Sequence, residues 1–432
     1  MACYFSSGMM PRLSPQTHFG RYGWVGILGH GAFSARSARA RPVVMIHLAQ
    51  SPKDPRFVQN PYAFYANARA AGPLVYWKEY GLVCATTHEA VNTILRDRRF
   101  GREPVEALNI PDHLAPFYAV EAHSMLELEP PRHTRLRGLV LRAFTSRRIA
   151  ELAPEIEALT HGLLDDTPEG PFDLLESLAR PLPVTIIARL LGVPEEIAPD
   201  LLTWSNAMVM MYVPDRTREQ EDRAVAATQN FVSFLRAYVE QRRSAPRDDL
   251  ISHLIAAEAE GEKLSTDELI ATCILLLNAG HEATVHTIGN GVKQKLETGA
   301  RFGAEPAVLV EEILRYDPPL HMFTRYVYED VTLFGHAFQR GDQVALLLAS
   351  AGRDGNVYAD AERFVPDRRD GPANLAFGAG LHFCVGAPLA RLGLQIALPI
   401  LFERFPDLHL VEPPQYADIY HFHGLERLIL AR

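Results

Sequence analysis

A single cysteine carries the clearest chemical signal in the chain. Cys384 lies among Gly378, Gly380 and Gly386, and the residues after it read as the start of a helix with Pro388 in its first turn. Glycines let the backbone turn tightly around a sulfur atom, and a helix N-terminus stabilises negative charge through its dipole. The pattern favours a thiolate that ligates a metal, although an isolated cysteine is most often a small buried hydrophobic residue.

The motif around this cysteine extends over ten residues. Its six fixed positions are Phe377, Gly378, Gly380, His382, Cys384 and Gly386. They resemble the haem-binding signature of the cytochrome P450 family. The resemblance implies that Cys384 is the axial ligand of a haem b iron and that His382 binds a haem propionate. Cysteinate ligation indicates oxidation, because it pushes electron density onto iron and favours O–O cleavage.

A second motif is Glu312 with Arg315, three residues later on an expected helix at 306–316. Alone, such a pair is a common surface feature that contributes a few tenths of a kcal/mol. The P450 resemblance extends to the segment 361–364, whose Arg363 would complete a buried Glu, Arg, Arg network. We therefore expect Glu312, Arg315 and Arg363 to act in folding and haem retention.

A third motif places two bases on one helical face. Pro130 and Pro131 prepare a helix start, after which His133 and Arg137 fall at i and i+4. Such a pair can clamp a carboxylate, and the alternative is a solvated basic face. The P450 resemblance implies that His133 and Arg137 bind the haem propionates, with Arg325 as a third partner.

The longest expected helix opens at Ser265 with Glu268 three residues on, which predicts a capping box. It should run about 25 residues, or roughly 38 Å. Ala279 and Gly280 near its middle would let a flat cofactor approach the backbone. A mid-helix glycine costs about 1 kcal/mol relative to alanine, so a reason for it is expected. The alternative reason is an ordinary close helix crossing.

The same helix departs from the family pattern. The family carries an acid followed directly by a threonine that helps to deliver protons. Here Glu282 supplies the acid, Ala283 occupies the alcohol position and Thr284 comes one residue later, about 100° around the helix. We expect Glu282 to relay protons through water, aided by Thr284 or by a hydroxyl group of the substrate.

The elements that must position these residues are mainly helical. Apolar residues recur at helical spacing in 145–165, 175–192, 224–242, 265–290, 306–316 and 386–404, whereas strand-like alternation is limited to 74–86, 331–334, 344–348 and 425–430. The pattern predicts a mainly α fold with small β-sheets. The resemblance implies the cytochrome P450 fold, with haem between the long helix and the cysteine loop.

The domain organisation is expected to be simple. No linker, repeat or low-complexity tract divides the chain, so we expect one cytochrome P450 domain over 45–432. Residues 1–44 contain no Asp or Glu but five Arg, and show no helical period. We expect a non-core extension there, either translated from a mis-assigned start or acting as a leader.

Composition excludes several functional classes. A net charge of −9 and a pI near 6.0 argue against nucleic-acid binding. Four cysteines without a C-x-x-C pair favour a reducing, cytoplasmic setting. The chain has no apolar run of about 18 residues, so no membrane-spanning helix is predicted.

The resemblance to the P450 family implies a monooxygenase that inserts one oxygen atom from dioxygen into a hydrophobic small molecule. The chain contains no nucleotide fingerprint, so NAD(P)H would act indirectly, through a ferredoxin-type or flavodoxin-type electron donor and its reductase. One alternative is a peroxide-dependent or isomerising haem-thiolate enzyme. A non-catalytic haem or ligand carrier is another.

Overall fold

Helices make up most of the computed structural model, which describes residues 45–213, 216–259, 264–300, 305–420 and 422–432. The expected extension 1–44 lies outside the described residues. The helices are α1 Pro55–Gln59, α2 Tyr62–Ala71, α3 His88–Arg96, α4 Ala115–Glu121, α5 Arg132–Ala143, α6 Ser146–Glu151, α7 Ala153–Asp165, α8 Pro181–Leu191, α9 Ala198–Val209, α10 Arg218–Ser244, α11 Leu250–Ala259, α12 Thr266–Thr298, α13 Pro306–Tyr316, α14 Leu348–Gly352 and α15 Ala387–Arg404. The mainly α class is therefore confirmed.

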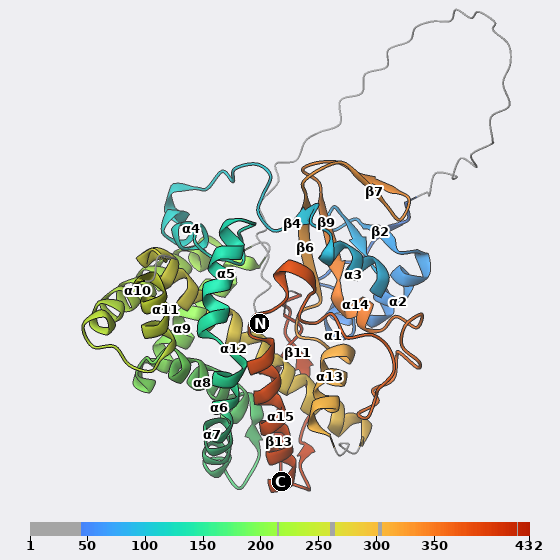
Figure 1. Cartoon of the computed structure of the whole chain (residues 1–432). Helices are drawn as coiled ribbons and strands as arrows, with labels where there is room; N and C mark the ends of the chain where they lie inside the picture. Colours follow the sequence, from blue (N-terminus) through green and yellow to red (C-terminus); the bar gives the residue numbers. More distant parts are fainter. Residues whose placement is uncertain (1–44, 214–215, 260–263, 301–304, 421) are drawn as a thin grey trace, which may run out of the picture.

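The strands are short and form small sheets. They are β1 His47–Leu48, β2 Leu74–Trp77, β3 Leu82–Ala85, β4 Phe100–Gly101, β5 Phe172–Asp173, β6 Met322–Val327, β7 Val331–Leu333, β8 His336–Phe338, β9 Gln343–Leu347, β10 His409–Leu410, β11 Gln415–Tyr416, β12 Leu425–Arg427 and β13 Ile429–Ala431. The largest sheet has six strands in the order β1-β2-β3-β9-β6-β4. Figure 1 shows this sheet on one side of the molecule and α4–α11 on the other.

The long helix α12 is the element that crosses between these two sides. Ser265 and Glu268 form the predicted capping box, in which each side chain accepts a hydrogen bond from the other residue's backbone N–H. The helix is longer than expected, with 33 residues, and Gly299 ends it in the left-handed conformation. The extra turns are held by helix-forming residues and by an ion pair of 2.6 Å between Lys293 and Glu297.

Buried apolar side chains from the helical side and from the sheet form one continuous core, which includes most of the inner positions of α12. No helix in the described part of the chain is long and apolar enough to cross a membrane.

A buried charge network joins α13 to the segment that follows α14. The Glu312 carboxylate accepts two hydrogen bonds from Arg315, at 2.6 and 2.8 Å, and one from the Val365 N–H at 2.6 Å. Arg368 donates a further hydrogen bond to it at 3.1 Å. Glu312, Arg315 and Arg368 expose 0%, 3% and 5% of their side chains, so the charges compensate each other away from water.

The prediction that Arg363 completes this network is wrong. Its side chain is 74% exposed and faces Asp360 at 3.5 Å, and only its backbone carbonyl contacts Arg315. The chain turns at Asp360, and the side chain that reaches the carboxylate is Arg368, five residues after Arg363. The segment offers several arginines, and their order in the sequence does not reveal which one the turn directs inward.

We predict that Arg368→Ala lowers the free energy of unfolding by about 3 to 5 kcal/mol, because it leaves part of the buried Glu312 charge uncompensated. Arg363→Ala is the matched control and should change it by less than about 0.5 kcal/mol, since that side chain lies in solvent. Equilibrium denaturation of the two variants checks this. Equal losses would contradict the assignment.

Candidate functional site

A cavity lies between α12 and the loop 377–386. Its walls come from α5, α8, α12, the start of α15 and the cysteine loop. Most of the wall is apolar, with Leu182, Ile186, Ile187, Leu275 and Leu276 among the lining residues. Mostly apolar walls with a few polar groups are typical of small-molecule and cofactor sites.

Cys384 lies in this wall and is 3% exposed. Its N–H donates a hydrogen bond to the Phe377 carbonyl at 3.0 Å, which closes the loop. Gly378 and Gly380 both have a φ of 70°, a conformation that L side chains rarely adopt. A Cβ at Gly380 would also meet the Leu95 carbonyl at 2.5 Å. The loop geometry therefore depends on these glycines.

The other described cysteines have a different character. Burial raises the pKa of Cys84 and of Cys273 to about 12, so both remain protonated and pack as small hydrophobic residues. Neither lines the cavity, and Cys3 lies outside the described residues. Among the described cysteines, Cys384 alone faces the cavity.

Two further loop residues support the cysteine in different ways. Gly386 lines the cavity and forms the N-terminal boundary of α15, with an ordinary helical φ of −79°. Phe377 is 1% exposed and does not line the cavity. The Arg391 guanidinium lies 4.5 Å from the centre of its ring, which anchors the loop against α15.

His133 and Arg137 from α5 both line the cavity, as the sequence predicts from their spacing. Burial lowers the pKa of His133 to about 4, and the nearby His382 and Arg137 add to the shift. The Nδ1 atom of His133 is buried without a hydrogen-bond partner among the described residues. A buried polar atom of this kind is costly to leave unpaired, and an anionic group in the cavity would supply its partner.

His382 lines the cavity beside His133, with ring centres 4.4 Å apart. Its Nε2–H donates to Glu129 at 2.9 Å. The pKa of His382 lies below its ordinary value, mainly because the ring is buried. The hydrogen bond to Glu129 opposes this shift, and the nearby charge of Arg325 adds to it. Arg325 is 2% exposed but does not line the cavity itself. Sequence reasoning missed Glu129, although it stands directly before the Pro130–Pro131 pair.

Five residues of α12 line the cavity, namely Leu275, Leu276, Ala279, Gly280 and Thr284. The Thr284 hydroxyl donates to the Gly280 carbonyl at 3.0 Å. A Cβ at Gly280 would lie 2.5 Å from the Ile187 side chain of α8. Gly280 therefore serves both expected roles, because it opens the cavity wall and also permits a close helix contact.

Glu282 and Ala283 do not line the cavity. Ala283 is buried in the core, and the Glu282 carboxylate lies 3.1 Å from the Nε2 atoms of both His281 and His286. Burial raises the pKa of Glu282, but hydrogen bonds from the two imidazoles outweigh it and hold the pKa well below its ordinary value. His281 is fully buried and also lies 3.1 Å from Asn206 of α9. The sequence did not single out either histidine as a functional residue.

The residues around the cavity fit a haem group. Cys384 offers a thiolate ligand on one wall, and Ala279 and Gly280 leave room for a flat group on the facing wall. The unpartnered nitrogen of His133 and the charge of Arg137 suit carboxylates at the edge of such a group.

Comparisons with known proteins agree with this fit. The Cytochrome P450 family model matches residues 41–292 and 307–424. The cytochrome P450 monooxygenase PikC of Streptomyces venezuelae is 39% identical over 374 residues, which cover 83% of this chain and 87% of that protein. The vitamin D(3) 25-hydroxylase of Pseudonocardia autotrophica is 37% identical over 386 residues, with coverages of 86% and 94%.

A solved structure shows the same fold. The crystal structure of P450BioI in complex with a fatty-acid-ligated acyl carrier protein matches with a TM-score of 0.82 and 32% identity, over 87% of this chain and 99% of that one. The chain therefore belongs to the cytochrome P450 family, as a monooxygenase that binds haem b and receives electrons from NAD(P)H through external redox partners.

Proposed function

We propose that this monooxygenase oxidises a hydrophobic small molecule held against the Ala279–Thr284 face of α12. The observation that carries the proposal is one cavity that joins the Cys384 thiol to this face through mostly apolar walls. Haem bound there supplies the activation of dioxygen and the transfer of one oxygen atom. The protein positions the substrate by apolar contact and excludes water from the reacting groups.

We propose that haem is retained by one iron ligand and by several basic side chains that contact its propionates. Cys384 would hold the iron, while His133, Arg137 and His382 would bind the propionates. Arg325 would act beside them through its charge on His382. Glu129 would then orient His382 through their 2.9 Å hydrogen bond and keep its ring against that of His133.

Oxygen transfer from dioxygen is tested directly with isotope-labelled dioxygen. NAD(P)H-driven turnover of a lipophilic substrate with a reconstituted redox chain should place one labelled oxygen atom in the product. A product whose oxygen comes only from added peroxide would favour the peroxide-dependent alternative. An isomerised product without labelled oxygen would favour the isomerising one.

Proton delivery is proposed to run from Glu282 through ordered water to Thr284. Glu282 is 26% exposed on its side chain, so it can exchange protons with solvent, and its low pKa keeps the carboxylate ionised. The Thr284 hydroxyl lies in the cavity wall and donates its hydrogen bond to the Gly280 carbonyl. Its oxygen can therefore accept a hydrogen bond from water. His281 and His286 hold the carboxylate in place.

We predict that Glu282→Gln lowers the turnover number at least tenfold, because the amide cannot relay a proton. Substrate-induced spectral shifts should remain, since Glu282 does not line the cavity. Glu297→Gln, near the end of the same helix, is the control and should turn over normally. Unchanged turnover in Glu282→Gln would exclude the relay.

A second variant tests the alcohol position. Ala283→Thr places a hydroxyl at the position where the family carries one, and it should change the fraction of reductant that appears as product. The measurement is product formed per NAD(P)H consumed. An unchanged ratio would mean that the position is unimportant in this enzyme.

The electron donor is proposed to be a ferredoxin-type or flavodoxin-type protein that docks near the cysteine loop. Phe383, directly before the ligand, is 36% exposed, and Arg137 donates to its carbonyl at 2.6 Å. The exposed Arg96 packs its backbone against Gly380 of the same loop. An exposed apolar residue beside cations suits a small acidic partner. Such donors, together with the free thiols of the described cysteines, support a cytoplasmic location.

We predict that Arg96→Glu slows haem reduction by an acidic ferredoxin severalfold at low ionic strength, because it reverses a charge at the proposed contact. Arg218→Glu on α10 is the control, since that side chain is 63% exposed and belongs to another element. Stopped-flow reduction under carbon monoxide measures both rates. Equal rates in the two variants would exclude this docking surface.

A further inference from the structure

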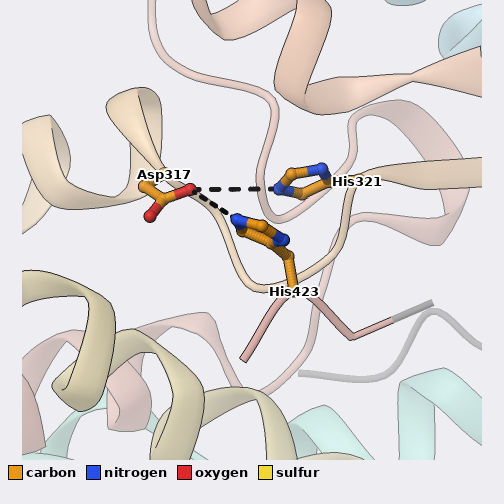
Figure 2. A group of neighbouring side chains, drawn as sticks. All are labelled: Asp317, His321 and His423. Atoms are coloured by element: carbon orange, nitrogen blue, oxygen red, sulfur yellow. Dashed lines mark ion pairs between the residues drawn. The ribbon is translucent and has the colours of Figure 1, made fainter. Parts of the chain in front are cut away.

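Three buried side chains meet outside the haem cavity, two of them four residues apart and the third from the C-terminal segment. Asp317 follows α13, His321 directly precedes β6, and His423 lies in the C-terminal segment before β12. They expose 1%, 0% and 7% of their surface. Figure 2 shows both imidazole rings directed at the Asp317 carboxylate. One ligand atom from each residue lies within 4.8 Å of the others.

The three groups converge without bonding to each other. The Asp317 Oδ1 atom lies 3.6 Å from the His423 Nε2 atom and 4.0 Å from the His321 Nε2 atom, and both gaps are too long for a hydrogen bond. The Nε2 atom of His321 has no hydrogen-bond partner among the described residues. A fully buried imidazole nitrogen that points into this gap without a partner indicates that something else belongs there.

The surrounding residues orient the cluster as they would orient metal ligands. The Tyr62 and Tyr416 hydroxyls donate to the two oxygens of Asp317 at 2.5 and 2.6 Å. The second ring nitrogen of His321 bonds to the Tyr65 hydroxyl at 2.9 Å. Hydrogen bonds that fix the carboxylate and the far nitrogen of an imidazole are the usual second layer around a protein metal site.

The Asp317 carboxylate has no direct Lys or Arg partner among the described residues. The guanidinium of Arg353 lies instead over the rings of Tyr62, at 3.2 Å, and Tyr316, at 3.7 Å, and its side chain pairs with Glu362. Arg353 and Lys293 act on the cluster electrostatically without pairing directly with Asp317, and a bound cation would neutralise the carboxylate at contact distance.

We propose that Asp317, His321 and His423 bind one divalent cation of the zinc class. Zinc bonds to imidazole nitrogen and carboxylate oxygen at about 2.0 to 2.2 Å, so ligand atoms in a tetrahedral site lie roughly 3.3 Å apart. The observed gaps of 3.6 and 4.0 Å would have to close by less than about 1 Å. Magnesium and calcium are disfavoured, because they prefer oxygen ligands.

The site would act in structure rather than in oxidation. Its three ligands tie the end of α13 to the start of β6 and to the C-terminal segment, and Tyr62 and Tyr65 add α2 to the same point. Strand β6 also carries Arg325, which lies near His382 of the haem cavity. A cation there would hold the sheet side and the C-terminal segment in register.

Metal analysis of the holoenzyme tests the proposal without reference to turnover. After dialysis with Zn²⁺ and removal of loosely bound ions, we expect one zinc per chain in addition to the haem iron. His321→Gln and His423→Gln should each lose the zinc, because glutamine retains polarity but is a poor zinc ligand. The exposed His409 provides the control variant His409→Gln, which should keep it. The haem spectrum reports that each variant is folded.

Thermal unfolding supplies a second readout. A strong chelator should lower the melting temperature of the natural protein by at least about 2 °C and leave His423→Gln unchanged. Absence of zinc from the natural protein, or equal zinc in all variants, would overturn the proposal. In the first case the cluster is only a packed polar network, and in the second the zinc is adventitious.

Discussion

The position of the Cys384 thiol opposite the small-residue face of α12 is the constraint on which the rest of the site depends. A flat cofactor must fit between them, so the loop needs Gly378 and Gly380 at positive φ and the helix needs Ala279 and Gly280. His133 and Arg137 of α5 must then lie at the edge of the same cavity. The buried network of Glu312, as part of the same fold, holds the chain that leads into the loop.

The two faces of α12 divide the proposed chemistry. Thr284 and the small residues face the cavity, while Glu282 turns away toward His281 and His286. Because residues two positions apart lie on nearly opposite sides of a helix, a proton path between Glu282 and Thr284 must pass through water. In the proposed relay, the lack of an alcohol at Ala283 would make ordered water in the cavity necessary for efficient turnover.

The parts predicted well from the sequence are those set by local spacing. The capping box at Ser265, the i, i+4 pair His133 and Arg137 and the cysteine loop depend on residues that are neighbours in the chain. The family resemblance supplied the cofactor, and without it the loop would have indicated only a metal-bound thiolate.

The parts that sequence reasoning missed depend on how distant segments meet. Arg368, rather than Arg363, reaches Glu312 because of a turn whose direction only the folded chain defines. Glu129 approaches His382 across 253 positions. The cluster of Asp317, His321 and His423 likewise needs the C-terminal segment to return beside β6. Apart from the four-residue spacing of Asp317 and His321, none of these contacts has a periodic or short-range signal.

The most direct test of the account is the carbon monoxide difference spectrum of the reduced, haem-loaded protein. Natural protein and Cys273→Ser should both give the red-shifted band of a thiolate-ligated haem, because Cys273 is buried in the core away from the cavity. Cys384→Ser should lose that band. Its retention in Cys384→Ser would contradict the assignment of Cys384 as the iron ligand.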